Sequence, residues 1–489
     1  MNAFLLDSTV ADLDRFAWEA ICNWSNDPSI NPVIAGIDYA ELTRFCLWDK
    51  VARSIRAQNP DRFAFEQARL KPPANSIQPH PNRLKFGLKQ ALSRFSAWKD
   101  IRSLTAKDYL YVPCWHPTLQ SVVRSLSESV AVVTPQASHF SQFPNIHSVR
   151  LPLSSDRPNL SQVELLHHSI LTGLKQQGIE LIQRDVIELR SQIIQLLLRT
   201  EQIEAELSML RPKAILLFAD NHFPVQSYVL VGRKLGIPTI MTQHGLDCEQ
   251  YCLEEAYADY ISVWGTSRLQ RYQTRSTWQP IQLQVNGNPD YDCFTPPTQI
   301  DRSGSYWLWA TRPHAPEKCY LPSRYPQEGI EILNALLGAL SRSPKARLVI
   351  KPHPLDDVKL YQSTINQHST RDRVVISSDA VRSLIPAARV VISEDSTVGL
   401  EAMFFGKIVV HAHFAASDPV MPFVKYQAAL PGYSAEMLQT TLEMLDQFSE
   451  VQEKQLLAGQ AQLIQDFVGH CDGQAQKRVT TMVRKILEQ

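Results

Sequence analysis

The chain has 489 residues, of which 44% are hydrophobic, with 49 basic and 49 acidic side chains. This length exceeds one usual core, so we expect two or three domains, and the hydrophobic content excludes general disorder. The balanced charge gives no reason to expect nucleic-acid binding, and the lack of any long apolar run excludes a membrane-spanning helix. Scattered cysteines without a CxxC pair indicate reduced thiols, so we expect a cytoplasmic protein.

The first 100 residues are predicted to be mainly helical. The apolar spacing of 10–22 and 38–55 is typical of amphipathic helices. The segment 71–84 is rich in Pro and Asn and indicates a linker. In 85–99, Lys and Arg alternate with Leu, Phe and Trp. A helix there either presents a solvated face or rests peripherally on the inner face of an anionic membrane.

From residue 108 the pattern alternates between strands and helices. Strands are predicted at 109–112, 130–133, 214–219, 237–242, 259–263 and 281–285. Helices are predicted over 162–209, with a break near Gly178, and over 224–235. This order indicates a parallel sheet, whose ligands gather beyond the carboxyl ends of the strands.

The proline-rich segment 295–300 marks a boundary before a second α/β unit. Its strands are predicted at 306–310, 347–350, 374–376, 390–392 and 408–411, followed by helical sequence over 434–487. We therefore predict an α/β protein with a helical N-terminal region (1–100), a first Rossmann-like lobe (101–298) and a second lobe with the terminal helices (299–489). Two such lobes joined by a linker leave a cleft that suits a ligand.

The stretch 389–410 carries the first candidate site. Ser396 is a plausible N-cap for a helix over 397–405, so the amides of 397–399 would face an anion at the helix N-terminus. Glu401 lies four residues beyond Thr397 on the same helix face, where its carboxylate could accept hydrogen bonds from a ribose diol. An ordinary capped helix is the alternative interpretation.

A second candidate follows strand 347–350, where the sequence is Lys351-Pro352-His353-Pro354. The two prolines stiffen the backbone, so His353 would sit on a rigid turn above the sheet. Lys351 and His353 could each donate to a phosphate oxygen. On its own, a HisPro pair is a common turn.

The first lobe offers His244, which follows strand 237–242 in Gln243-His244-Gly245. At the carboxyl end of that strand its imidazole would face the cleft. Asp220, at the end of the neighbouring strand, is a candidate to orient the imidazole.

Together these motifs resemble a known group of enzymes. The motifs are QHG (243–245), GNPDYD (287–292), KPHP (351–354), SEDSTVGLEA (393–402) and DGQAQKRV (472–479). In this order they resemble bacterial capsule and surface-polysaccharide glycosyltransferases of the GT-B fold, including Kdo transferases, and the related teichoic-acid glycerophosphotransferases. The resemblance covers roughly 210–480.

The resemblance implies a role for each candidate. His244 would be the acceptor-side base, Lys351 and His353 would bind the donor phosphate, Ser396 and Thr397 would hold phosphate or nucleotide, and Glu401 the ribose. It implies a nucleotide-sugar donor, with a CMP-sugar such as CMP-Kdo favoured, a glycan or glycolipid acceptor, and neither cofactor nor metal. One departure is the acidic pair at 394–395, which would repel a donor phosphate unless it faces away.

Two other functions stay open. A nucleotide-sugar 2-epimerase shares the two-lobe fold, although the SerGlyGly-type phosphate loop and paired acids expected there are missing from this sequence. A non-catalytic scaffold of a polysaccharide assembly complex would use the N-terminal region to bind partners.

Overall fold

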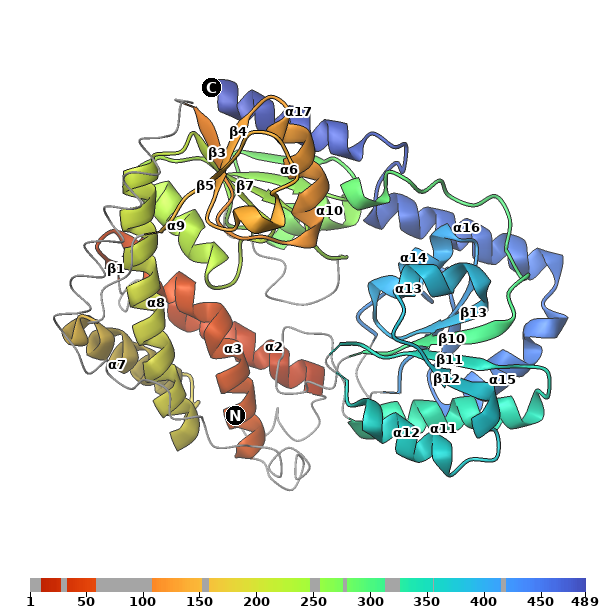
Figure 1. Cartoon of the computed structure of the whole chain (residues 1–489). Coiled ribbons are helices and arrows are strands. Elements are labelled where there is room, and N and C mark those ends of the chain that lie inside the picture. Colours follow the sequence, from red (N-terminus) through yellow and green to blue (C-terminus); the bar gives the residue numbers. More distant parts are fainter. Residues whose placement is uncertain are drawn as a thin grey trace.

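The computed structural model describes most of the chain and arranges it in two α/β lobes side by side (Figure 1). The described residues are 10–27, 33–58, 108–151, 158–246, 256–275, 279–312, 326–354, 356–414 and 419–489. The predicted linker at 71–84 and the basic segment at 85–99 lie outside these ranges. No helix of the described residues is long and apolar enough to cross a bilayer.

The first lobe is built on a seven-stranded parallel sheet with the order β5-β4-β3-β6-β7-β8-β9. Its strands are β3 (Tyr109–Tyr111), β4 (Ala131–Thr134), β5 (Ile146–Ser148), β6 (Ala214–Leu217), β7 (Thr239–Thr242), β8 (Tyr260–Val263) and β9 (Gln282–Val285). Its helices are α6 (Gln120–Ser127), α7 (Leu160–Gln176), α8 (Gln183–Leu210), α9 (Val225–Leu235) and α10 (Thr266–Arg275). The strand order reverses between β3 and β6, and that reversal is where a doubly wound sheet binds its ligand.

The second lobe has a six-stranded parallel sheet with the order β12-β11-β10-β13-β14-β15. Its strands are β10 (Tyr306–Ala310), β11 (Leu348–Lys351), β12 (Val374–Ile376), β13 (Ala388–Ser393), β14 (Ile408–Ala412) and β15 (Leu430–Gly432). The helices around it are α11 (Pro326–Arg342), α12 (Val358–Asn366), α13 (Val381–Leu384), α14 (Thr397–Phe404), α15 (Ala435–Met444) and α16 (Glu450–Phe467). Here the order reverses between β10 and β13. The predicted fold class, two Rossmann-like lobes with a helical N-terminal region, is confirmed.

The N-terminal helices α2 (Val10–Ser25) and α3 (Tyr39–Ala57) pack against the first lobe, beside α7 and α8 (Figure 1). Their tryptophans Trp24 and Trp48 are almost fully buried in the same apolar core as the α8 side chains. An ion pair of 2.6 Å between Arg53 and the buried Asp185 joins α3 to α8. This region therefore shares its core with the first lobe.

The last helix, α17 (Ala475–Glu488), crosses back to the first lobe and packs on α6. Val479 and Val483 join the apolar cluster beneath that face of the first sheet. The carboxylate of Asp292 caps the helix by accepting the amides of Ala475 (2.9 Å) and Gln476 (2.8 Å). This helix was expected to belong to the second lobe. The domain limits stay predictions, but the packing of α17 ties both lobes together.

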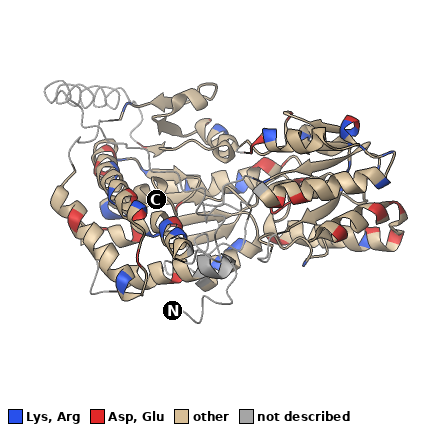
Figure 2. Ribbon diagram, turned by 90° about the horizontal axis from the view of Figure 1, so that it is seen from below, with Lys and Arg blue, Asp and Glu red and all other residues tan. Residues whose placement is uncertain are grey.

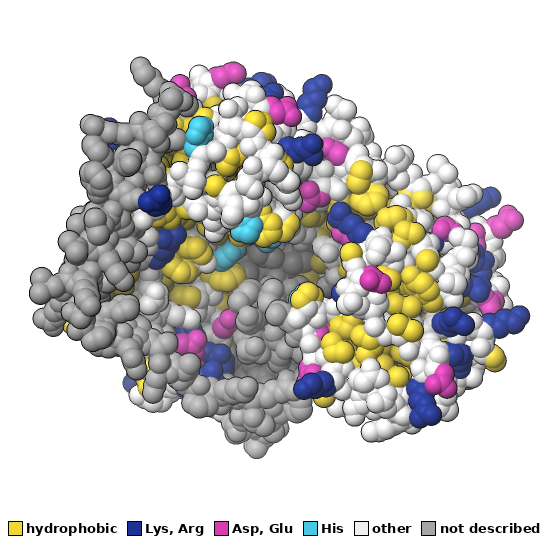
Figure 3. All heavy atoms as spheres, viewed as in Figure 1, with side chains coloured by type: hydrophobic (Ala, Val, Ile, Leu, Met, Phe, Trp, Pro, Cys, Tyr) yellow, Lys and Arg dark blue, Asp and Glu magenta, His cyan; other side chains and the backbone are white. Residues whose placement is uncertain are grey.

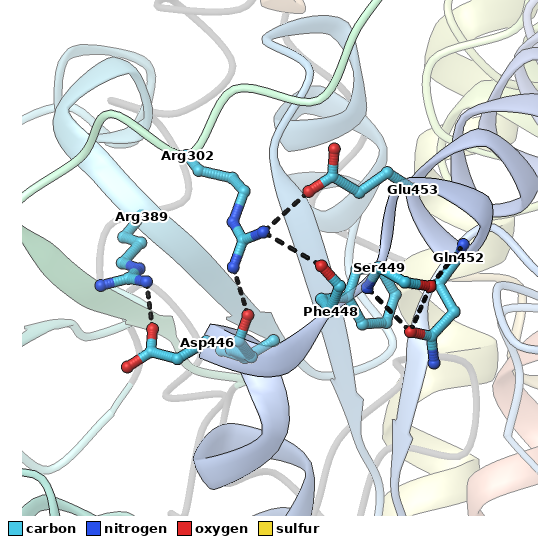
Figure 4. Close-up of polar contacts among 8 residues, drawn as sticks. Arg302, Arg389, Asp446, Phe448, Ser449, Gln452 and Glu453 are labelled. Atoms are coloured by element: carbon cyan, nitrogen blue, oxygen red, sulfur yellow. Dashed lines mark hydrogen bonds and ion pairs between the residues drawn. The ribbon is translucent and has the colours of Figure 1, made fainter.

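The entry into the second lobe is tied to its C-terminal helices (Figure 4). Arg302, which precedes β10, donates to Glu453 (2.8 Å) and to the carbonyl of Phe448 (3.3 Å). Ser449 and Gln452 form the capping box that begins α16. These bonds fix where the linker ends and the second sheet begins.

Basic and acidic residues are interspersed along the described helices, strands and loops (Figure 2), which agrees with the equal numbers of acids and bases in the sequence.

Candidate functional site

A buried polar network occupies the reversal point of the second sheet. The carboxylate of Asp395, two residues after β13, accepts hydrogen bonds from Arg312 (2.8 Å), His411 (3.0 Å) and His413 (3.0 Å). It also accepts the backbone amide of Met421 at 2.8 Å. Because β10, β13 and β14 are neighbours in the sheet, the residues that end them meet at one edge.

The acidic pair 394–395 faces this interior. Burial alone would raise the pKa of Asp395, but Arg312 and the two imidazoles hold it well below its usual range. Glu394 accepts the indole N–H of Trp309 at 3.1 Å and is only 3% exposed. The two acids thus have partners inside the lobe, which removes the predicted conflict with a donor phosphate.

His353 stands next to β10 at the same edge. Its backbone amide donates to the hydroxyl of Thr311 at 2.9 Å. Thr311 in turn donates to Asp356, whose carboxylate also accepts the hydroxyl of Tyr361 at 2.9 Å. Burial lowers the pKa of the His353 imidazole, as does Lys351, while Asp356 opposes them. The KPHP turn is therefore held by a hydrogen bond to Thr311, the neighbour of Arg312 in the chain.

The N-terminus of α14 is capped as predicted. The Ser396 hydroxyl accepts the amide of Val398 at 3.3 Å, and the carbonyl of Ser396 accepts that of Gly399 at 3.2 Å. Two of the three amides expected to face an anion are therefore bonded to Ser396. A phosphate would meet the Thr397 amide first and gain the Val398 amide by rotating the serine hydroxyl away.

Glu401 has protein partners in this structure. Its Oε1 accepts Arg382 at 2.9 Å and the hydroxyl of Tyr291 at 3.3 Å. Tyr291 belongs to the GNPDYD turn after β9, where the chain leaves the first lobe. This contact therefore links that turn to α14 of the second lobe. Phe294 stacks on Phe404 beside it, with ring centroids 5.2 Å apart. A ribose would have to share the carboxylate with this interlobe contact.

In the first lobe, His244 lies at the reversal-point side of the sheet. Its Nδ1 is 2.9 Å from the carbonyl oxygen of Phe218. A carbonyl only accepts, so the proton sits on Nδ1 and Nε2 carries the lone pair. Asp220 Oδ2 accepts the amides of Tyr257 (2.8 Å) and Ala258 (3.0 Å). The role of Asp220 in orienting the imidazole stays a prediction.

Two further histidines, which were not predicted as site residues, lie around Phe218. The ring of His116 stacks on Phe218 at 4.6 Å and meets His244 edge-on at 5.3 Å, while His222 lies 5.9 Å from Phe218. Histidine side chains, in cyan, lie on the first lobe beside the hollow between the lobes (Figure 3). His116 follows β3 and His222 follows β6. Their position after parallel strands was the one feature of the sequence that could have predicted them as site residues.

These histidines are held neutral. Burial and the neighbouring His116 and His222 lower the pKa of His244 to about 3. Burial and His116 lower the pKa of His222 to about 4, and burial lowers that of His116. An unprotonated imidazole can accept a proton, although such low values make it a weak base until a substrate changes its surroundings.

The described residues contain no group of His, Cys, Asp and Glu side chains that could hold a metal ion. The acidic pair near the linker, Asp290 and Asp292, is bonded to protein groups and not arranged as a metal site. Asp292 caps α17, and Asp290 accepts the hydroxyl of Ser121 at 3.4 Å.

Residues 252–416 match the family model of the capsule polysaccharide biosynthesis proteins. The resemblance read from the motifs is confirmed over this segment. The matched segment runs from β8 to β14 and so contains the KPHP turn, the polar network and α14. The histidine cluster of the first lobe, with His244, lies before the matched segment. No curated protein sequence matches the chain significantly.

Solved structures of similar architecture include a UDP-GlcNAc 2-epimerase, MnaA and a teichoic acid polymerase. The UDP-GlcNAc 2-epimerase from Neisseria meningitidis bound to UDP-GlcNAc is 13% identical, with a TM-score of 0.48 over 77% of this chain and 100% of its own. MnaA of S. aureus with UDP is 13% identical, with a TM-score of 0.47 over 78% and 97%. The wall teichoic acid polymerase TagF is 9% identical, with a TM-score of 0.44 over 83% and 98%. Because these scores are below 0.5, the description of the fold rests on the strand order.

Proposed function

We propose that this protein is a glycosyltransferase of surface or capsular polysaccharide biosynthesis that uses a nucleotide-activated sugar. The supporting observation is the family match over 252–416, the segment that contains every candidate donor residue. A CMP-sugar such as CMP-Kdo is the favoured donor, because the HisPro motif resembles that of bacterial Kdo and sialyl transferases. A metal-independent reaction and a cytoplasmic location, peripheral at the inner face of the membrane, belong to the same proposal.

In this proposal the second lobe binds the donor. Lys351 and His353 donate to the phosphate, since they end β11 beside the reversal point of the sheet. Ser396 and Thr397, at the start of α14, bind the same phosphate or the nucleotide. The Asp395 network holds the loop between β13 and α14 in place. Glu401 accepts the ribose hydroxyls once it gives up part of its contact with Tyr291.

The first lobe provides the base. The acceptor hydroxyl oxygen attacks the anomeric carbon of the donor sugar, and the bond from that carbon to the phosphate oxygen breaks. Nε2 of His244, whose Nδ1–H is anchored on Phe218, takes the hydroxyl proton. The nucleotide leaves with the bonding electron pair, and its charge is stabilised by Lys351 and His353. The acceptor is a glycan or a glycolipid.

A ligand screen followed by a transfer assay tests this function. The melting temperature is measured with CMP-, UDP-, GDP- and CDP-linked sugars, since a ligand at about 100 times its Kd stabilises the fold by about 2.7 kcal/mol. We expect stabilisation by a CMP-sugar and release of the nucleotide on adding acceptor. Epimerisation of a free nucleotide sugar without acceptor would contradict the proposal, as would nucleotide binding without any turnover.

A further inference from the structure

A groove of about 360 Å³ lies at the outer edge of the first sheet, between β9 and α17. Strand β9 pairs with β8 on one side only, and its alternate residues Gln282 and Gln284 line the groove. None of the candidate residues for donor or acceptor lines it. The groove is therefore a separate surface of the molecule.

The lining is basic and rich in amides. Lys477 and Lys485 are exposed on α17, and no ion pair joins either lysine to another residue in the described part of the chain. Arg478 is already bonded to Asp472 and to the carbonyl of Asn286. No acidic side chain lines the groove, and its floor contains the buried Met482 and Ile486.

The spacing of these charges suits an extended ligand. Lys477 and Lys485 are eight residues apart on one helix, so their backbone positions differ by about 12 Å along the helix axis. Gln282 Nε2 donates to Gln284 Oε1 at 2.9 Å, and the remaining groups of the two amides can donate and accept hydrogen bonds, as sugar hydroxyls do. A flat membrane would need protruding apolar residues, whereas Met482 and Ile486 lie on the floor of a concave surface.

We propose that this groove binds an anionic oligosaccharide chain, with the two lysines on acidic groups several sugar units apart and the glutamines on hydroxyls. This goes beyond the proposed transfer reaction, because the groove retains a chain and takes no part in bond making. Capture of an anionic lipid surface is the competing outcome of the test.

The test measures binding of the full-length protein to a fluorescently labelled hexamer of α-1,4-linked galacturonate, without any nucleotide sugar. The variant K477E/K485E is compared with K345E/K454E, which carries the same charge change on exposed lysines of the second lobe. We expect binding about fivefold weaker for K477E/K485E only, since two exposed charge pairs contribute roughly 1 kcal/mol together. Maltohexaose, which has no charge, should bind poorly.

Three results would overturn the inference. The wild type could fail to bind the galacturonate, the two double variants could bind it equally, or only vesicles containing phosphatidylglycerol could retain the protein. Because donor and turnover are absent from the assay, its failure leaves the transferase proposal untouched. Equally, a protein that lacks transferase activity can still pass this test.

Discussion

Asp395 and Arg312 form a 2.8 Å ion pair in which both side chains are buried, although 83 residues separate them in the chain. The pair crosses the reversal point of the second sheet and fixes the loop that leads into α14. Breaking it leaves the Arg312 guanidinium buried without its carboxylate. A buried pair that loses one partner typically costs about 3–5 kcal/mol.

Asp395→Asn should therefore lower the free energy of unfolding by about that amount. The measurement is urea unfolding at neutral pH. Asp446→Asn is the matched control, because Asp446 pairs with Arg389 at the surface, where the loss should be below about 1 kcal/mol. Equal losses in the two variants would show that the buried network contributes no more than a surface pair.

Stability should fall in two separate pH windows. The pKa of Asp395 is depressed in the folded state, so its contribution is complete above the unfolded pKa of about 4 and is lost as the pH falls below it. The folded pKa values of His244 (about 3) and His222 (about 4) are lowered from 6.5. The unfolded chain then binds more protons below about pH 6.5, so stability already declines from there.

Unfolding curves between pH 7 and pH 4 test the histidine window. His244→Gln should reduce the slope of the free energy of unfolding against pH by up to about 1.4 kcal/mol per pH unit. An unchanged slope would mean that the imidazole is not held neutral by its surroundings.

Donor affinity should depend on His353. Removing a charge-assisted hydrogen bond costs about 1.5–3 kcal/mol, so His353→Ala should weaken binding of the nucleotide roughly tenfold or more. His368→Ala, which alters a turn histidine of the same lobe, serves as control. Circular dichroism checks that both variants fold. Wild-type affinity in folded His353→Ala would remove this residue from the donor site.

Glu401 should distinguish a ribonucleotide from its 2′-deoxy analogue. Glu401→Gln keeps the shape but weakens the acceptor, so the preference for the ribonucleotide should shrink. Tyr291→Phe removes only the 3.3 Å hydrogen bond to Glu401 and should keep the preference. If the wild type and both variants prefer the ribonucleotide equally, the Glu401 carboxylate contacts only Tyr291 and Arg382 and does not bind the ribose.

Turnover should depend on His244. A positioned general base contributes about 10²–10⁴ in rate, so His244→Ala should lose most transfer activity. Donor binding should stay nearly intact, because the donor residues belong to the other lobe. His168→Ala, on the exposed face of α7, is the control. A folded variant that binds donor and still transfers near the wild-type rate would exclude His244 as the base.

The sequence by itself determined the order of the strands and helices. Runs such as 214–217 and 390–392 are apolar, the second is also β-branched, and Ser396 has the side chain that caps a helix, so local preference and burial agree. The strands β5 and β15 were not predicted, since their sequences, IHS and LPG, lack the run of β-branched residues that marks an equally short strand such as β12. The motifs also indicated the family that matches 252–416.

Only the tertiary structure decided which side chains meet. From the sequence, Asp395 was expected to repel a donor phosphate. In the structure it is hydrogen-bonded to Arg312 and two histidines, because β10, β13 and β14 become neighbours in the sheet. Asp220 and His244 follow adjacent strands, and each is hydrogen-bonded to backbone groups: Asp220 to the amides of Tyr257 and Ala258, and His244 to the carbonyl of Phe218. Pairing across a sheet depends on distances that arise after the chain has folded, and residue spacing in the sequence does not contain them.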